Sequence, residues 1–92
     1  MHDWILKSVL FEWKLARVIF IFDNLQAIEA KLIAADVVDL HITQRKEWGP
    51  SVSVNNLIGP SDLEGGVRKL IIEMQSGDVI TIIASAFDIP AK

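Results

Sequence analysis

The chain has 92 residues and a formal net charge of −3, and it is 51% hydrophobic and 23% charged. This length allows one domain, residues 1–92, and the apolar content excludes intrinsic disorder. The absence of cysteine excludes disulfide scaffolds, thiolate metal sites and cysteine nucleophiles, and it agrees with a cytoplasmic location.

Charge and hydropathy also indicate which partners are not expected. An acidic chain lacks the basic stripe of a nucleic-acid-binding protein, so we expect no nucleic-acid partner. The start of the chain, Met1 to Trp4, has no basic n-region, and the apolar runs are the length of strands. We therefore expect neither a secretion signal nor a membrane partner.

The apolar content is rich in isoleucine and valine, whose branched side chains favour strands. We expect a mainly β fold: an antiparallel meander, small sandwich or roll of about six to seven strands. At most one short helical turn is expected, near residues 61–65, where Ser61 and Glu64 have the spacing of a capping box and Gly65-Gly66 follows.

Residues 4–13 and 16–22 alternate in the manner of two strands, joined by a tight connection near Lys14-Leu15. The aromatic side chains of both strands share one face, which we expect to point into the core. They are Phe11, Trp13, Phe20 and Phe22.

Residues 25–35 fit two structures. They contain good helix formers, with Leu25, Ile28 and Leu32 at helical spacing, but they also alternate as a strand does. The alternative fold is therefore α+β, with a helix at 25–35. Asp23-Asn24 breaks the preceding strand, and residues 37–43 form a clearer strand.

The second half begins with a loop-rich stretch, residues 44–66, in which residues 51–57 form a short irregular strand. Residues 67–75 and 79–85 then alternate around a turn at 76–78, which is typical of a β-hairpin. Residues 86–92 are expected to be a tail.

Catalytic and metal-binding patterns are weak. The two histidines, His2 and His41, lie far apart in the sequence, so we expect no metal site, no cofactor and no enzyme activity. An enzyme that works through His41 with Glu73 or Asp78 is the least favoured hypothesis.

The strands carry more apolar residues than one face of a sheet requires. We expect several aliphatic side chains to point away from the core and to form an interface between copies in a homo-oligomer: Leu10, Ile19, Ile21, Ile71 and Ile83. The alternative is a two-layer sandwich or a covering helix that hides both faces within the same chain.

Binding residues are expected in loops that a rigid sheet holds in place. The first candidates lie around the Gly-Pro loop, and the chain start supplies the second group: Trp48, Ser51, Ser53, Asn55, then His2 and Asp3. In the alternative function, a small-ligand-binding domain, Trp48 and Trp4 wall a pocket.

Three stretches resemble a set of small uncharacterised bacterial β-rich proteins, over residues 1 to about 84. They are Met1-His2-Asp3 followed by Leu6, Ser8, Phe11 and Trp13; Trp48-Gly49-Pro50-Ser51 with Ser53-Val54-Asn55; and Glu73-Met74-Gln75-Ser76-Gly77-Asp78. The resemblance implies a bacterial protein in which residues 28–34 form a strand. The chain departs from the pattern at Leu10, Leu15 and Ala16, where polar residues are expected.

In size, acidity and fold class the chain also looks like immunity-type proteins, which neutralise toxins by binding them. Together with the outward aliphatic residues, this similarity favours a non-catalytic protein-interaction module that associates with itself or with another protein.

Overall fold

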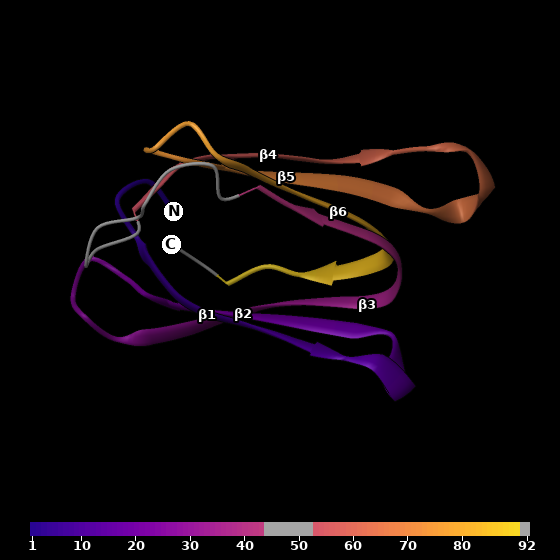
Figure 1. Ribbon diagram of the computed structural model, residues 1–92, viewed down its shortest axis with the longest axis horizontal. Coiled ribbons are helices and arrows are strands. Elements are labelled where there is room, and N and C mark those ends of the chain that lie inside the picture. Colours follow the sequence, from indigo (N-terminus) through magenta and orange to yellow (C-terminus); the bar gives the residue numbers. More distant parts are fainter. Residues whose placement is uncertain (44–52, 91–92) are drawn as a thin grey trace.

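The computed structural model describes residues 1–43 and 53–90. Six antiparallel strands form one sheet in the order β1-β2-β3-β6-β5-β4 (Figure 1). The strands are β1 (Ile5–Glu12), β2 (Arg17–Asp23), β3 (Glu29–Ile42), β4 (Val54–Asp62), β5 (Arg68–Met74) and β6 (Val79–Asp88). The prediction of a mainly β, antiparallel fold is confirmed.

The alternative helix at 25–35 is wrong. Residues from Glu29 onward belong to the 14-residue strand β3, which pairs with β2 on one side and with β6 on the other. Two ladders of hydrogen bonds, with Leu32 and Ala34 fully buried between the layers, outweigh the weak helix propensity of this segment.

β3 and β6 run through both layers of the folded sheet, as Figure 1 shows. β3 bends at Asp36, whose φ of 53° is left-handed, and its pairing with β6 shifts between Val37 and Asp39. On either side of the bend Ala34 is buried and Val37 packs against the core, so the chain turns a corner without losing its inward side chains. The predicted separate strands at 28–34 and 37–43 are therefore one bent strand.

The core lies between the two layers and takes alternate residues from each strand. Its fully buried large side chains are Phe20, Phe22, Leu32, Leu70, Ile72, Met74, Ile80, Ile82, Val18 and Val54. The predicted hairpin of β5 and β6 is confirmed, and its alternate residues Leu70, Ile72, Met74, Ile80 and Ile82 are buried. β6 extends to Asp88, into the predicted tail, because its end pairs with the first half of β3.

The turn between β2 and β3 is organised by Asn24. Its Oδ1 accepts hydrogen bonds from the backbone N–H groups of Gln26 and Ile28, at 2.9 and 3.0 Å. Ala27 follows with a left-handed φ of 58°, the position at which such hairpin loops commonly place glycine. The predicted strand break at Asp23-Asn24 is confirmed.

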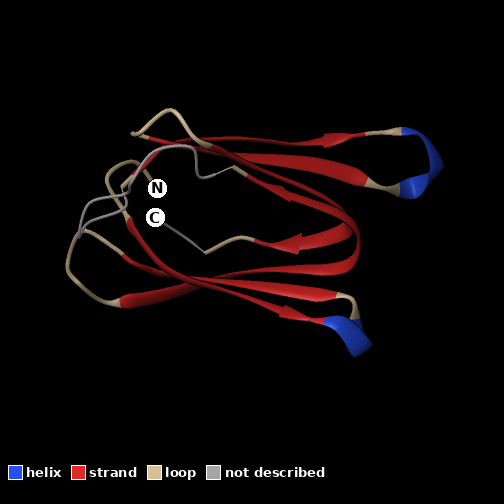
Figure 2. Ribbon diagram, viewed as in Figure 1, coloured by secondary structure: helices blue, strands red, loops and turns tan. Residues whose placement is uncertain are grey.

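Two short 3-10 turns lie at the same end of the molecule, at the tips of the β1–β2 and β4–β5 hairpins (Figure 2). They cover Trp13–Leu15 and Glu64–Gly66. The expected capping box is wrong: Ser61 belongs to β4, and the residue that precedes the second turn, Leu63, makes no side-chain cap.

The other end of the roll is held together by the start of the chain. The N–H of Asp3 donates to Val54 O at 2.9 Å, the N–H of Val54 donates to Trp4 O at 2.8 Å, and Ile5 forms a bridge with Ser53. Trp4 is 4% exposed and meets Phe22 edge-on, with ring centroids 6.2 Å apart. This closed end joins the two edge strands, β1 and β4.

Candidate interaction surface

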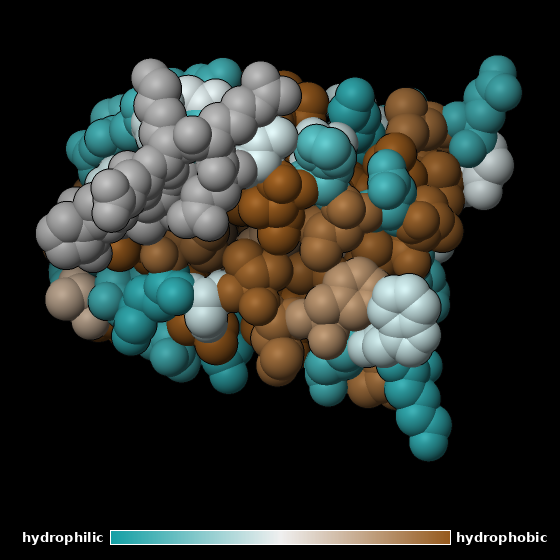
Figure 3. Space-filling view, viewed as in Figure 1, coloured by the Kyte–Doolittle hydropathy of each residue, from teal (hydrophilic) through white to brown (hydrophobic). Residues whose placement is uncertain are grey.

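The opposite end of the roll is open and apolar. Within the described residues, the two edge strands are joined only near Ile5 and Ser53, and they separate toward the 3-10 turns. Figure 3 shows the result as a brown surface that runs between the layers. Apart from Leu25 and Ile28 at the β2–β3 turn, the exposed large hydrophobic side chains of the described residues are Leu10, Phe11, Trp13, Leu15, Val38, Ile42, Ile58 and Leu63.

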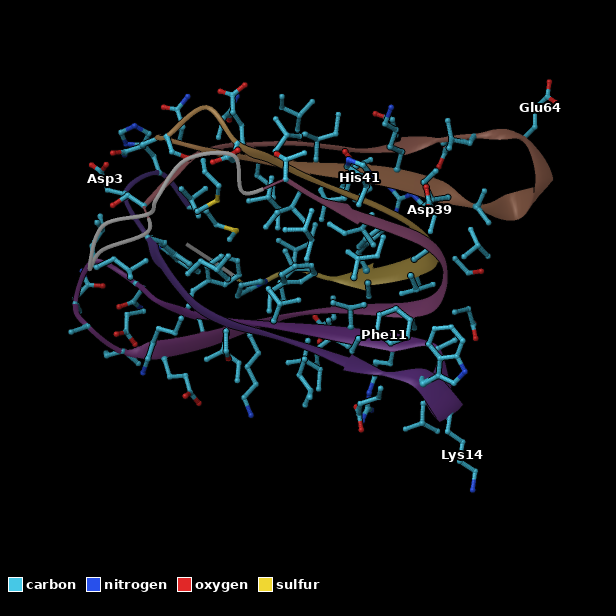
Figure 4. All side chains as sticks on the ribbon, viewed as in Figure 1. Asp3, Phe11, Lys14, Asp39, His41 and Glu64 are labelled. Atoms are coloured by element: carbon cyan, nitrogen blue, oxygen red, sulfur yellow. The ribbon has the colours of Figure 1, made fainter. Side chains whose placement is uncertain are left out.

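A groove of about 360 Å³ lies at this end, and we call it the mouth groove. It is lined by Phe11, Trp13, Val37, Val38, Asp39 and Leu40. The rings of Phe11 and Trp13 contact each other with centroids 5.5 Å apart and planes tilted by 39°. Phe11 and Asp39 stand on opposite sides of the opening in Figure 4. The groove therefore joins an aromatic wall from β1 to an aliphatic wall from the bend of β3.

Trp13 corrects the sequence interpretation. It was expected in the core with Phe20 and Phe22, and these two are fully buried, but Trp13 is 86% exposed. β1 ends at Glu12, so the alternation no longer applies to Trp13, which begins the 3-10 turn. A large aromatic group is thus presented to solvent at the edge of the mouth groove.

Four of the predicted binding residues meet at the closed end: His2, Asp3, Ser53 and Asn55. Asp3 accepts a hydrogen bond from Gln75 Nε2, and the Nδ2 of Asn55 donates to Glu73 Oε1 at 2.6 Å. His2 and Asn55 also share a pocket of about 310 Å³, lined further by Met1, Asn56, Leu57, Ile89 and Pro90. The other two candidates, Trp48 and Ser51, lie outside the described residues.

Trp4, expected as a pocket wall together with Trp48, is buried against Phe22. It forms part of a pocket of about 290 Å³ with Met1, His2, Asn24, Leu25 and Gln26. Its position is explained by the closure of the roll, because it fills the space between the chain start and β2.

The five predicted interface residues fall on two different outer faces. Leu10 is 50% exposed and pairs with Ile19, which pairs in turn with Ile33, so these three make one apolar row on the outer face of β1, β2 and β3. Ile71 and Ile83 lie on β5 and β6 in the other layer. All except Leu10 are half-buried in the single chain.

His41 and Asp78, two residues of the least favoured enzyme hypothesis, lie in different environments. His41 is exposed and pairs with Thr81. Asp78 is buried in the β5–β6 turn, where Thr43 Oγ1 donates to its Oδ1 at 3.3 Å and Ser76 Oγ donates to its Oδ2 at 3.1 Å. Among the described residues, no group of three or more metal-ligating side chains is present.

The mouth groove was only partly visible in the sequence. Phe11 and Trp13 were singled out as aromatic residues of one strand face, although they were expected in the core. Val37, Val38 and Asp39 were not, because they reach the groove through the bend at Asp36, and a left-handed aspartate gives no periodic signal.

Comparisons of the chain with protein-family models, with curated proteins and with solved structures gave no match. Within the described residues, no helix is long and apolar enough to cross a membrane.

Proposed function

We propose that the chain is a cytoplasmic, non-catalytic protein-interaction module that binds through its mouth groove. The observation that carries this proposal is Trp13, which is 86% exposed, contacts the ring of Phe11 and borders an apolar groove. Tryptophan is the residue most often found at the energetic centre of protein interfaces, because it offers a large rigid surface and one hydrogen-bond donor.

Energetics favour a partner over permanent exposure to water. Burial of one large apolar side chain contributes about 1.5–3 kcal/mol. Phe11, Val38 and Leu15 surround Trp13 with further exposed apolar surface, so a partner that covers them together gains several such contributions. The mouth groove alone is too small to select one protein partner, so the apolar surface around it has to contact the partner as well.

The lining also indicates the chemistry of the partner. The groove accepts an apolar side chain, and Asp39 supplies a negative charge at its wall. The chain as a whole carries −3. We therefore propose a partner surface with an apolar centre and a basic residue beside it, which is also the type of toxin surface that an immunity-type protein would neutralise.

Photo-crosslinking in living cells tests the proposal. A benzophenone amino acid at position 13 should form protein adducts, whereas the same probe at Lys31, which is exposed on β3, should form few. An equal yield of adducts at the two positions would contradict the assignment of the mouth groove as the binding surface.

A second candidate function is small-ligand binding at the closed end. It is favoured by the pocket of about 310 Å³ in which His2 and Asn55 add polar groups to an apolar floor of Met1, Leu57 and Ile89. A metabolite that raises the melting temperature of the native chain but not that of an Asn55→Leu variant would support this function.

A further inference from the structure

The two edge strands of the sheet differ in how well they are protected against pairing with another chain. β4 carries two register shifts, between Val54 and Asn56 and between Ile58 and Ser61, and it contains Pro60. Bulges and proline interrupt the regular row of backbone groups that an incoming strand needs. β4 is therefore a poor template for a further strand.

β1 lacks this protection over its second half. Its pairing with β2 is regular from Ser8 to Glu12, and its one register shift lies earlier, between Leu6 and Ser8. Within the described residues, the outer edge of β1 meets another strand only at Ile5. Residues 8–12 thus form a short, regular segment next to the mouth groove, and its outer edge pairs with no other strand in the described part of the chain.

The sequence of this edge is complementary to itself. In an antiparallel pair of two copies centred on Leu10, Val9 faces Phe11 of the other copy on the inner side, and Leu10 faces its own copy on the outer side. Shifting the register by one residue would place inner residues opposite outer ones, because side chains alternate along a strand. Centring the pair on Val9 or Phe11 would keep the faces aligned but would set Leu10 opposite Ser8 or Glu12. The apolar pattern therefore selects the register centred on Leu10.

Charge and packing agree with this register. The two charged residues in this region, Lys7 and Glu12, have opposite signs and lie at opposite ends of the segment. In this register Glu12 faces Ser8 of the other copy and lies diagonal to Lys7, whereas parallel pairing would place like charges together. Within each copy, Lys7 also lies 3.6 Å from Asp23, and Glu12 forms an ion pair with Arg17. On the outer face, the row of Leu10, Ile19 and Ile33 would continue into the same row of the second copy.

From these observations we infer that the partner of the open end is a second copy of this chain, which pairs antiparallel along β1 about Leu10. The two six-stranded sheets become one continuous sheet, and a two-fold axis passes near Leu10, which closes the assembly at two copies. This inference rests on the proposed function, because it names the protein that the interaction surface binds.

A single cysteine provides the direct test, since the chain has none of its own. Paired residues on neighbouring antiparallel strands have Cα atoms about 4.5–5.5 Å apart, which lies within the range that a disulfide spans. Under mild oxidation, Leu10→Cys should give a covalent dimer at least about tenfold faster than Leu25→Cys. Leu25 is the matched control because it is more exposed, at 69%, and lies in the β2–β3 turn. Equal rates would overturn the inference.

Sedimentation equilibrium gives a second test that does not depend on one variant. The native chain should be dimeric, and Leu10→Lys should raise the dissociation constant about tenfold or more, because two lysines would face each other at the axis. Leu25→Lys, at a more exposed site in the β2–β3 turn, should change it much less. A native chain that stays monomeric at high micromolar concentration would overturn the inference. If a probe at position 13 nevertheless crosslinked to a different protein, the proposed function would stand and only the self-pairing along β1 would be rejected.

Discussion

The buried phenylalanines of β2 and the exposed tryptophan that follows β1 have opposite roles, although all three were expected in the core. Phe20 is fully buried between the layers, whereas Trp13 is 86% exposed. We expect Phe20→Ala to lower the free energy of unfolding by about 3–5 kcal/mol, because it leaves a cavity in the core. Trp13→Ala should change it by less than about 0.5 kcal/mol. Urea denaturation of the monomeric protein measures both, and a comparable loss in the two variants would contradict the exposed position of Trp13.

Gly59 tests the close packing of β4 against β5. A Cβ at this position would lie 2.7 Å from the backbone oxygen of Lys69, and its φ is +96°. Gly65 also has a positive φ, +83°, but a Cβ there meets no atom within 4 Å. Both alanine variants should lose the roughly 1–2 kcal/mol that a left-handed alanine costs.

Gly59→Ala should lose about a further 1–3 kcal/mol, because a backbone atom cannot move aside as a flexible side chain can. Thermal unfolding of the two variants, compared at equal protein concentration, measures this difference. Equal losses would show that β4 lies farther from β5 than in this structure.

At the scale of elements, the β2–β3 turn contains backbone strain that a glycine would relieve. Ala27 adopts a left-handed φ of 58° without the freedom of glycine. Ala27→Gly should therefore raise the free energy of unfolding, by about 0.5 kcal/mol after the greater entropy of the unfolded glycine is subtracted. The matched control, Ala30→Gly within β3, should lower it by about 0.5–1 kcal/mol. A loss of stability in the Ala27 variant would contradict the turn geometry.

The periodic elements were the ones that sequence reasoning could predict. Alternation located the β5–β6 hairpin and its inward residues, because each strand has a buried and an outward side. It failed where the chain leaves that pattern: at Trp13, one residue past the end of β1, and at Asp36, where β3 turns from one layer to the other. Both departures depend on contacts with distant strands, which no short window of sequence contains.

For the candidate sites, too, the sequence indicated the residue types but not the contacts between distant segments. The meeting of His2, Asp3, Ser53 and Asn55 at the closed end depends on pairing between residues about 50 positions apart in the chain. The residue types were recognisable, but their proximity was not. In the same way, Phe11 was visible as an apolar strand residue, whereas its position opposite Asp39 comes from the bend of β3.

The whole molecule is a roll with two unlike ends. The closed end is held by the start of the chain and buries Trp4, at 4% exposure. The open end presents the mouth groove and the unprotected edge of β1. We propose that the apolar surface at the open end is free in the single chain and is covered when the chain binds its partner.

Hydroxyl-radical footprinting of Trp13 and Trp4, read by mass spectrometry at increasing protein concentration, tests this claim most directly. In dilute, monomeric protein Trp13 should be oxidised much faster than Trp4, and its rate should fall as the chains associate while that of Trp4 stays low. Oxidation of Trp13 as slow as that of Trp4 in the monomer would contradict the account, because it would mean that the chain covers its own open end.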